Sequence, residues 1–186
     1  MTVESALQDA VKKMKGAISV LHEELGAIRT GRATPALLNR VTVDYYGSTV
    51  PLNQLASFSV PEPRLLVIQP FDKNAIPGTE RAIQTSDLGI TPSNDGNVIR
   101  LAFPPLTEER RKELIRIAHE RAEEARVAVR NVRRHAKDAL ERLEHDHEIS
   151  EDDLKRSEKE LQRLTDQFVA EVDQALGHKE KELGEV

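Results

Sequence analysis

The feature that most constrains the fold of this chain is an apolar stripe that recurs in three separate segments. In the first segment the apolar residues follow alternating steps of four and three, the heptad spacing of one face of a long α-helix: Leu7, Val11, Met14, Ile18, Leu21, Leu25 and Ile28. We predict a helix that passes through Gly16 and Gly26 and ends at Thr30 and Gly31. A stripe this narrow needs partner helices to bury it.

Apolar residues at helical spacing recur after about residue 107. Thr107 is a typical N-cap, so a second helix is predicted from there to near His145. Its seam is Leu114, Ala118, Ala122, Ala125, Val129, Val132, Ala136, Leu140 and Leu143. A third helix is predicted from Ser150, where Asp153 completes a capping box, and its seam is Leu154, Leu161, Leu164, Phe168, Val172 and Ala175. Because the link between these two helices is short, they must pack antiparallel, and the three stripes predict a three-helix bundle.

Residues 36–105 differ, being rich in proline and in short apolar runs that suit strands. Four elements are predicted there: a β-hairpin over residues 41–52 with its turn at Gly47 and Ser48, a strand over 64–69, a short helix around 79–86 with Ala82 and Ile83 facing inward, and a strand over 98–101 after a turn at 94–96. The predicted fold class is therefore α+β. A long three-helix bundle comprises residues 1–30 and 106–186, and a small β/α/β domain, residues 31–105, is inserted after the first helix.

Several classes of site are excluded by composition. The chain has no cysteine, which rules out disulfides, thiolate zinc sites and cysteine nucleophiles. His145 and His147 flank Asp146, but no convincing third ligand is near in the sequence, so we predict no metal site. No glycine-rich loop leads into a helix with Lys-Ser or Lys-Thr, so we predict no bound nucleotide, no cofactor and no enzymatic activity.

Neither a secretion signal nor a membrane span is predicted. The first residues lack the basic start and the apolar run of a signal. No stretch approaches the roughly 20 apolar residues that a bilayer span needs. We therefore expect a cytoplasmic protein with no membrane partner.

The second predicted helix carries the most strongly charged surface. Net charge is −5, yet residues 125–137 contain only cations among their charged side chains: Arg126, Arg130, Arg133, Arg134 and Lys137. Steps of four, three and four place four of these on one helix face, and guanidinium groups bind phosphate through paired hydrogen bonds. We predict an anion-binding stripe on this basic side of the bundle and an acidic opposite side formed by the third helix. The alternative is a solvated face whose cations pair with acids across the bundle.

Two short connections join the predicted bundle to the insert. Paired linkers rich in Gly or Pro commonly form a hinge, although Pro-Pro also stiffens a joint. The residues that we predict to form the hinge are Thr30, Gly31, Ala33 and Thr34 in one connection and Pro104 and Pro105 in the other. Arg29 and Arg32 flank the Thr-Gly pair and add cations at this joint.

Base-specific recognition of RNA is not predicted. Modules that read single strands usually offer aromatic side chains for stacking. Tyr45 and Tyr46 are adjacent, so on a strand they would face opposite sides and could not form one platform. Recognition of a polyanion by shape and phosphate suits this sequence better.

Six motifs, in order and spread along most of the chain, resemble those of ribosome recycling factors. They are Ile28-Arg29-Thr30-Gly31-Arg32-Ala33, Asp44-Tyr45-Tyr46-Gly47, Gln54-Leu55-Ala56-Ser57, Ser86-Asp87-Leu88-Gly89, Pro105-Leu106-Thr107-Glu108-Glu109-Arg110-Arg111 and Val129-Arg130-Asn131-Val132-Arg133-Arg134. The resemblance covers essentially the full length. It is loosest at Ala75-Ile76-Pro77-Gly78, which does not look helical where the family has its short helix.

The resemblance implies a three-helix bundle joined flexibly to a β/α/β domain, with an outline similar in size to transfer RNA. It implies binding to ribosomal RNA of the large subunit in the post-termination ribosome. Elongation factor G with GTP then acts as the partner, and the ribosome separates from messenger and transfer RNA. The family's RNA-contacting arginines correspond to Arg29, Arg32, Arg130, Arg133 and Arg134. We expect a monomer that relies on GTP hydrolysis by its partner.

A rival interpretation, from another class of protein, is a coiled-coil adaptor whose helices bind partner helices. It predicts oligomerisation that depends on concentration and no affinity for ribosomes. An enzyme is a remote third interpretation, because no residues stand at catalytic spacing.

Overall fold

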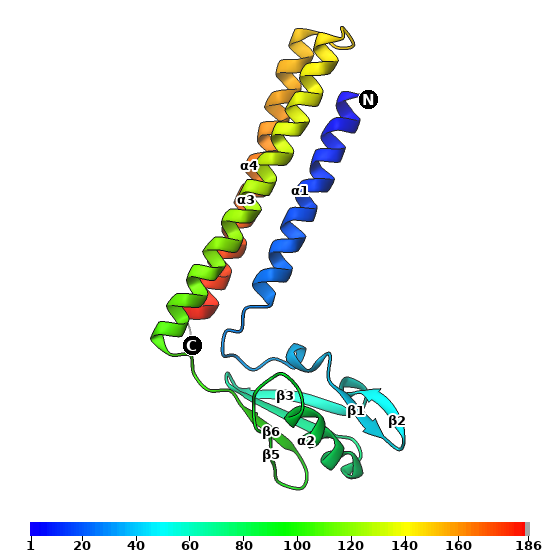
Figure 1. The fold of residues 1–186 in the computed structure, drawn as a ribbon, viewed down its shortest axis with the longest axis vertical. Coiled ribbons are helices and arrows are strands. Elements are labelled where there is room, and N and C mark those ends of the chain that lie inside the picture. Colours follow the sequence, from blue (N-terminus) through cyan, green and yellow to red (C-terminus); the bar gives the residue numbers. More distant parts are fainter. Residues whose placement is uncertain (185–186) are drawn as a thin grey trace. The chain divides into compact units, whose positions relative to one another are not determined.

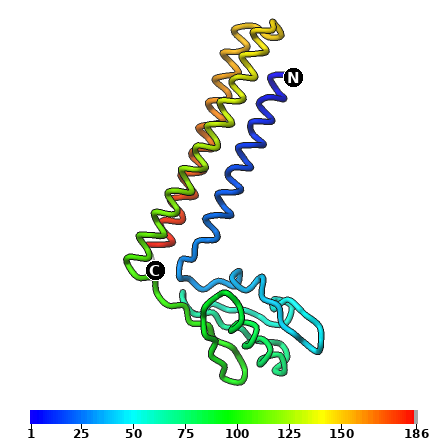
Figure 2. The backbone as a smooth tube through the Cα atoms, viewed as in Figure 1, coloured from blue at the N-terminus to red at the C-terminus, as the bar shows by residue number. Residues whose placement is uncertain are grey.

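The computed structural model describes residues 1–184, which form two compact units (Figure 1). Among the described residues, one unit combines Met1–Arg29 with residues 107–184, and the other is Thr30–Leu106. The backbone leaves the first unit after α1 (Val3–Gly26) and returns to it at α3 (Glu108–His145), which is followed by α4 (Glu151–Gly184) (Figure 2). The second unit is thus an insertion in the connection between α1 and α3.

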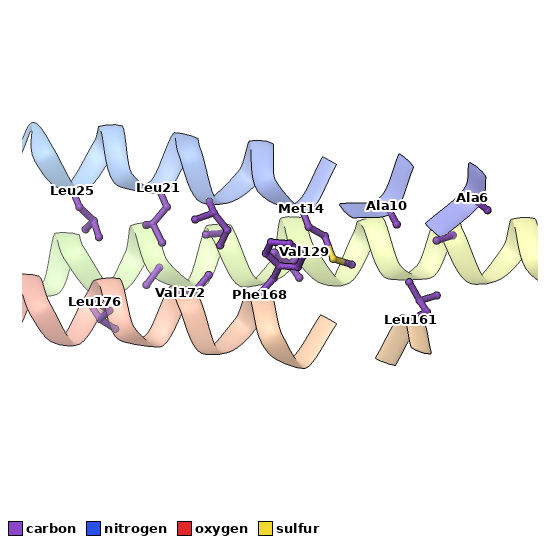
Figure 3. Close-up of a cluster of buried hydrophobic side chains, with 14 of the residues drawn as sticks. Ala6, Ala10, Met14, Leu21, Leu25, Val129, Leu161, Phe168, Val172 and Leu176 are labelled. Carbon is purple, nitrogen blue, oxygen red and sulfur yellow. The ribbon is translucent and has the colours of Figure 1, made fainter. Parts of the chain in front are cut away.

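The first unit is a bundle in which each of the three helices packs against the other two. Its core is a continuous row of apolar side chains, and Figure 3 shows Leu21 from α1, Val129 from α3 and Phe168 from α4 turned toward a common axis. Most of the predicted seam positions are buried, among them Met14 and Leu140, which are fully enclosed. Burying each such side chain contributes about 1.5–3 kcal/mol, so the bundle depends on this row.

Helix α1 is shorter than the prediction. It ends at Gly26 and not at Thr30, because the N–H of Ile28 bonds the carbonyl of Leu25 in a tighter turn. Glycine is a poor helix former, which makes it a natural place for this change. Ile28 still packs partly against the core from outside the helix. Its position continued the apolar spacing, which is why the predicted helix was too long.

The starts of α3 and α4 agree with the capping signals in the sequence. The Thr107 hydroxyl accepts a hydrogen bond from the N–H of Arg110 at 3.1 Å. At α4, the Asp153 N–H donates to the Ser150 hydroxyl at 3.1 Å, and the Asp153 carboxylate accepts from the Ser150 N–H at 3.3 Å. These bonds satisfy backbone donors that would lack partners in the first turn.

The second unit contains an antiparallel four-stranded sheet in the order β3-β4-β6-β5, a separate two-stranded hairpin and one α-helix. The elements are η1 (Pro35–Leu38), β1 (Thr42–Tyr45), β2 (Ser48–Pro51), η2 (Leu52–Gln54), β3 (Ala56–Glu62), β4 (Leu65–Pro70), η3 (Lys73–Ala75), α2 (Ile76–Gln84), β5 (Ser93–Asn94) and β6 (Ile99–Ala102). Its own core includes the fully buried Leu52, Leu66, Ile68, Ile99 and Leu101.

Two strands of this sheet were not predicted. The longer, β3, contains Pro61, which argues against a central strand but is tolerated at an edge. Its pairing with β4 is irregular between Ser59 and Glu62, and this irregularity accommodates the proline. The other, β5, has only two residues, too few to produce an alternating pattern.

Helix α2 begins at Ile76, earlier than the predicted start near Thr79. Pro77 lies in the first turn, where the missing N–H is no loss. Gly78 allows close packing on β1, since a Cβ there would meet the Asp44 carbonyl oxygen at 3.3 Å. Ile83 is buried as predicted, and Ala82 is partly buried.

The β1–β2 hairpin closes through a two-residue turn with positive φ at both positions, Tyr46 at 49° and Gly47 at 80°. This is the type I′ pattern, which strongly favours Asn-Gly. A residue with a Cβ costs about 1–2 kcal/mol in this left-handed conformation. The turn brings the rings of Tyr45 and Tyr46 together with centroids 4.6 Å apart in an edge-to-face arrangement. The prediction that these rings face opposite sides is therefore wrong, because Tyr46 lies in the turn and not on the strand.

Candidate nucleic-acid interface

The basic stripe predicted from the sequence lies on one uninterrupted helix, α3. Its five cations, Arg126, Arg130, Arg133, Arg134 and Lys137, all belong to α3, and the buried Ala125, Val129 and Ala136 of the same helix anchor that segment in the core. The cations are thus presented by a rigid support, which keeps their spacing constant. What each can bind depends on the groups that lie within reach of it.

Arg126 is committed to the bundle. Its side chain is only 19% exposed, and its Nε and Nη2 donate to one carboxylate oxygen of Asp173 on α4 at 3.0 and 2.7 Å. Its Nη1 donates to Glu123 at 3.1 Å. The hydrogen bond to Asp173 raises the pKa of the Arg126 guanidinium further. Arg126 is therefore paired with an acid across the bundle, which is the alternative interpretation of the basic stripe.

Arg130 and Lys137 have acidic neighbours at longer range. The Arg130 guanidinium lies 3.7 Å from a Glu123 oxygen, and the Lys137 ammonium lies 3.6 Å from a Glu141 oxygen. Both acids stand just outside residues 125–137, which is why the segment looked free of carboxylates. All four side chains are about half exposed, and exposed pairs at such distances contribute little. Both cations can therefore exchange these partners for a phosphate.

Arg133 and Arg134 keep their positive charge uncompensated. Arg133 Nη1 donates to the neutral amide oxygen of Gln162 at 3.2 Å, which orients the guanidinium without neutralising it. Arg134 is exposed, and among residues 1–184 no acidic side chain is paired with it. These two are the arginines best placed to receive an anion.

Helix α4 adds two lysines that the sequence analysis missed. A shallow cleft of about 310 Å³ lies between α3 and α4 and is lined by Arg133, Lys137, Lys155, Glu158, Lys159, Leu161 and Gln162. Lys155 pairs with Glu151 at 3.0 Å, both of them well exposed. The sequence predicts an acidic side on this helix because its acids outnumber its cations. The four-residue spacing of Lys155 and Lys159 was the signal that could have revealed this basic edge.

The predicted hinge residues occupy the connections between the two units. Gly31 has a φ of 76°, a conformation that favours glycine. Ala33 and Thr34 are fastened to the insert, since the Ala33 N–H donates to the Pro63 carbonyl at 2.8 Å and the Thr34 hydroxyl caps η1. Ala33 and Thr34 are therefore held to the insert by hydrogen bonds. Pro104 and Pro105 belong to no helix or strand.

Arg29 and Arg32 flank the first connection but belong to different units. Arg29 is exposed and Arg32 is partly buried. Neither residue lies on α3 with the basic stripe. That they bind an anion stays a prediction. Within residues 1–184, no three His, Asp or Glu side chains are grouped to hold a metal ion.

A comparison with protein families identifies the chain. The family model described as ribosome recycling factor matches residues 21–183. The chain belongs to this family. Among curated relatives, the ribosome-recycling factor of Acidothermus cellulolyticus is 56% identical over 184 residues, covering 99% of this chain and all of the relative. That of Carboxydothermus hydrogenoformans is 57% identical over 181 residues, covering 97% and 98%.

Solved structures of the family are similar over the whole chain. A solution structure of a ribosome recycling factor is 46% identical, with a TM-score of 0.78 and coverage of 100% of this chain and 99% of that one. A Thermus thermophilus ribosome recycling factor, described together with Escherichia coli elongation factor G bound to the E. coli post-termination complex, is 48% identical. Its TM-score is 0.65, with coverage of 98% and 99%.

Family membership confirms the predicted function and the predicted α+β fold class with its helical bundle. Family membership favours ribosome recycling over the rival interpretation, a coiled-coil adaptor. Ribosome recycling factors are translation factors and not enzymes. No helix among the described residues has the length and apolar character needed to cross a membrane.

Proposed function

We propose that this protein binds the post-termination ribosome in the cytoplasm through ribosomal RNA of the large subunit. Elongation factor G and GTP then join it to promote disassembly of the complex and release from messenger RNA. The observation that carries the proposal is the pair Arg133 and Arg134, two uncompensated guanidinium groups on a rigid helix. The T. thermophilus relative, described with elongation factor G on a post-termination complex, supports the choice of partners.

The interface proposed on the bundle is centred on α3. Arg133 and Arg134 make charge-assisted hydrogen bonds to phosphates, with Arg130 and Lys137 exchanging their weak acidic partners for the same purpose. Lys155 and Lys159 extend the surface onto α4. Arg126 stays in the bundle and holds α3 against α4 through Asp173. By resemblance to the family, Arg29 and Arg32 contact RNA near the hinge.

The proposed mechanism is a wedge. Phosphate contacts hold the bundle on the ribosome, while the insert moves about the hinge when elongation factor G pushes it. The energy comes from GTP hydrolysis in that partner, so this chain needs no active site. The freedom of movement is assigned to Thr30 and Gly31 on one side and to Pro104 and Pro105 on the other.

The anion site is tested by removing single guanidinium groups. We expect Arg133→Ala and Arg134→Ala each to weaken ribosome binding by about 1–3 kcal/mol, with a shallower dependence of affinity on salt. Arg116→Ala serves as a matched control on the same helix, because Arg116 is exposed and outside the stripe. Cosedimentation with ribosomes at several salt concentrations measures the effect. Unchanged affinity in a folded Arg133→Ala variant would remove Arg133 from the site.

The function itself is tested on post-termination ribosomes in sucrose gradients. Subunits should appear only when this protein, elongation factor G and GTP are all present. Intact ribosomes with no cosedimenting protein would contradict the proposal.

A further inference from the structure

An aromatic cluster with a carboxylate lies at the tip of the β1–β2 hairpin, in the insert, whereas the basic stripe of α3 belongs to the bundle. The Tyr45 hydroxyl donates to Asp72 Oδ2 at 2.8 Å, and the Tyr46 hydroxyl lies 3.5 Å from the same oxygen. Asn74 Nδ2 donates to the Tyr46 hydroxyl at 3.5 Å. The Tyr45 ring supports the Tyr46 ring edge to face, with centroids 4.6 Å apart. The cluster therefore holds one aromatic ring in a defined orientation.

The fold gains little from having tyrosine at position 46. Its side chain is 76% exposed, so it buries little apolar surface. Its φ of 49° is a conformation that a bulky residue rarely adopts, and the following Gly47 makes Asn the favoured choice for this turn. A strained, exposed aromatic residue kept in place by its neighbours points to recognition, since strain of this kind is characteristic of functional sites.

The charge of the cluster indicates what the ring can receive. The Asn74 N–H and the Tyr45 hydroxyl lower the pKa of Asp72, which is thus ionised at neutral pH. A carboxylate beside the ring repels the phosphates that accompany a stacking base. A guanidinium or ammonium group can instead lie over the ring face and approach the carboxylate. Lys73, the neighbouring cation, is exposed, and no contact between it and either ring is found among the described residues.

We infer that Tyr46, supported by Tyr45 and Asp72, is a docking point for an arginine or lysine side chain of a protein partner. The inference rests on the proposed function, in which elongation factor G is the protein that acts on the insert, and we assign the cationic side chain to that factor. The bundle provides ribosome affinity and the hairpin tip provides the contact through which the partner pushes. The two surfaces are then separable by mutation.

Tyr46→Asn tests this contact with little risk to folding. It creates the Asn-Gly pair that a type I′ turn favours, so the variant should unfold at a temperature no lower than the wild type. We expect the elongation factor G concentration needed for half-maximal splitting to rise about tenfold, because the variant loses a desolvated cation–π contact. Ribosome affinity without elongation factor G should stay unchanged. Tyr46→Phe, which retains the ring, should stay within about twofold of wild type, and Asp72→Asn should be intermediate.

A photocrosslink identifies the partner directly. The full-length protein with p-benzoylphenylalanine in place of Tyr46 is bound to post-termination ribosomes with and without elongation factor G. A crosslink to elongation factor G, at a peptide containing Arg or Lys, is the expected result. Two outcomes would overturn the inference: a crosslink only to ribosomal RNA or to a ribosomal protein, or an unchanged requirement for elongation factor G in Tyr46→Asn. If the wild type still splits ribosomes, the proposed function is unaffected by either outcome. If the wild type itself does not split ribosomes, both proposals fail.

Discussion

Arginines on one face of a helix can have different chemistry, because each guanidinium meets a different neighbour. Arg126 reaches Asp173 at 2.7 Å and is largely enclosed, whereas Arg133 reaches only the amide of Gln162. A charge that is paired and partly buried is costly to withdraw from its partner, and one held by a neutral group is available. The binding capacity of the stripe therefore depends on partners on α4 and not on the number of cations in α3.

At the residue scale, the turn between β5 and β6 gives a pH prediction. The N–H groups of Val98 and Asn97, together with Arg100, lower the pKa of Asp95 from 3.8 to about 2. Because the folded pKa lies below the unfolded one, the stabilisation is fully present above about pH 4 and is lost as pH falls toward 2. The insert should thus lose stability across this window in the wild type, and less so in Asp95→Asn.

Urea unfolding at pH values from 5 to 2 measures this difference. Both tyrosines lie in the insert and the chain has no tryptophan, so tyrosine fluorescence reports on that unit alone. Asn keeps an oxygen that can accept the same backbone hydrogen bonds but carries no charge. Parallel pH profiles for the two proteins would contradict the role given to Asp95.

At the element scale, glycines inside helices differ in what surrounds them. Gly16 lies in the middle of α1, and a Cβ built there meets nothing within 4 Å. Gly16→Ala should therefore stabilise the protein by about 0.5–1 kcal/mol, through lower entropy of the unfolded chain and better helix propensity. Thermal unfolding followed by helical circular dichroism measures the change.

Gly78→Ala is the matched control, because its Cβ would crowd the Asp44 carbonyl oxygen at 3.3 Å and the Val43 side chain at 3.4 Å. That variant should gain nothing or lose stability, although it too replaces glycine by alanine inside a helix. Equal gains in both variants would mean that propensity alone decides and that the packing of α2 on β1 is looser than described.

At the scale of the whole molecule, the two units have separate cores and are joined by two connections. In the wedge mechanism, ribosome binding belongs to the bundle and splitting requires movement of the insert. A crosslink between the units should therefore spare ribosome affinity and abolish most splitting. Because the chain has no cysteine, one cysteine introduced in each unit gives a specific pair for a short bifunctional reagent.

The comparison uses one protein before and after reduction of a cleavable crosslinker. Splitting that returns on reduction attributes the defect to the lost movement and not to the substitutions. Undiminished splitting by the crosslinked protein would contradict the moving wedge.

The periodic parts of this protein could be predicted, and the irregular parts could not. Heptad steps and capping residues indicated α3 and α4, since both signals depend only on residues a few positions apart. Strand β3 escaped prediction because Pro61 is acceptable only at a sheet edge, and edge position depends on distant strands. The end of α1 was misplaced for a similar reason, because Ile28 contributes to the core from outside the helix.

The sequence by itself determined the three amphipathic helices, the inserted unit and the place of the basic stripe. Apolar periodicity and local charge depend only on residues that are close together in the sequence. Only the tertiary structure decided which cations are available. The packing of α4 against α3 brings Asp173 to Arg126 and Gln162 to Arg133. It also brings Lys155 and Lys159 to the cleft that Arg133 lines. Likewise, only the folded insert brings Asp72 to the two tyrosines. These outcomes depend on Coulomb interactions and hydrogen bonds between residues far apart in sequence, which local patterns do not encode.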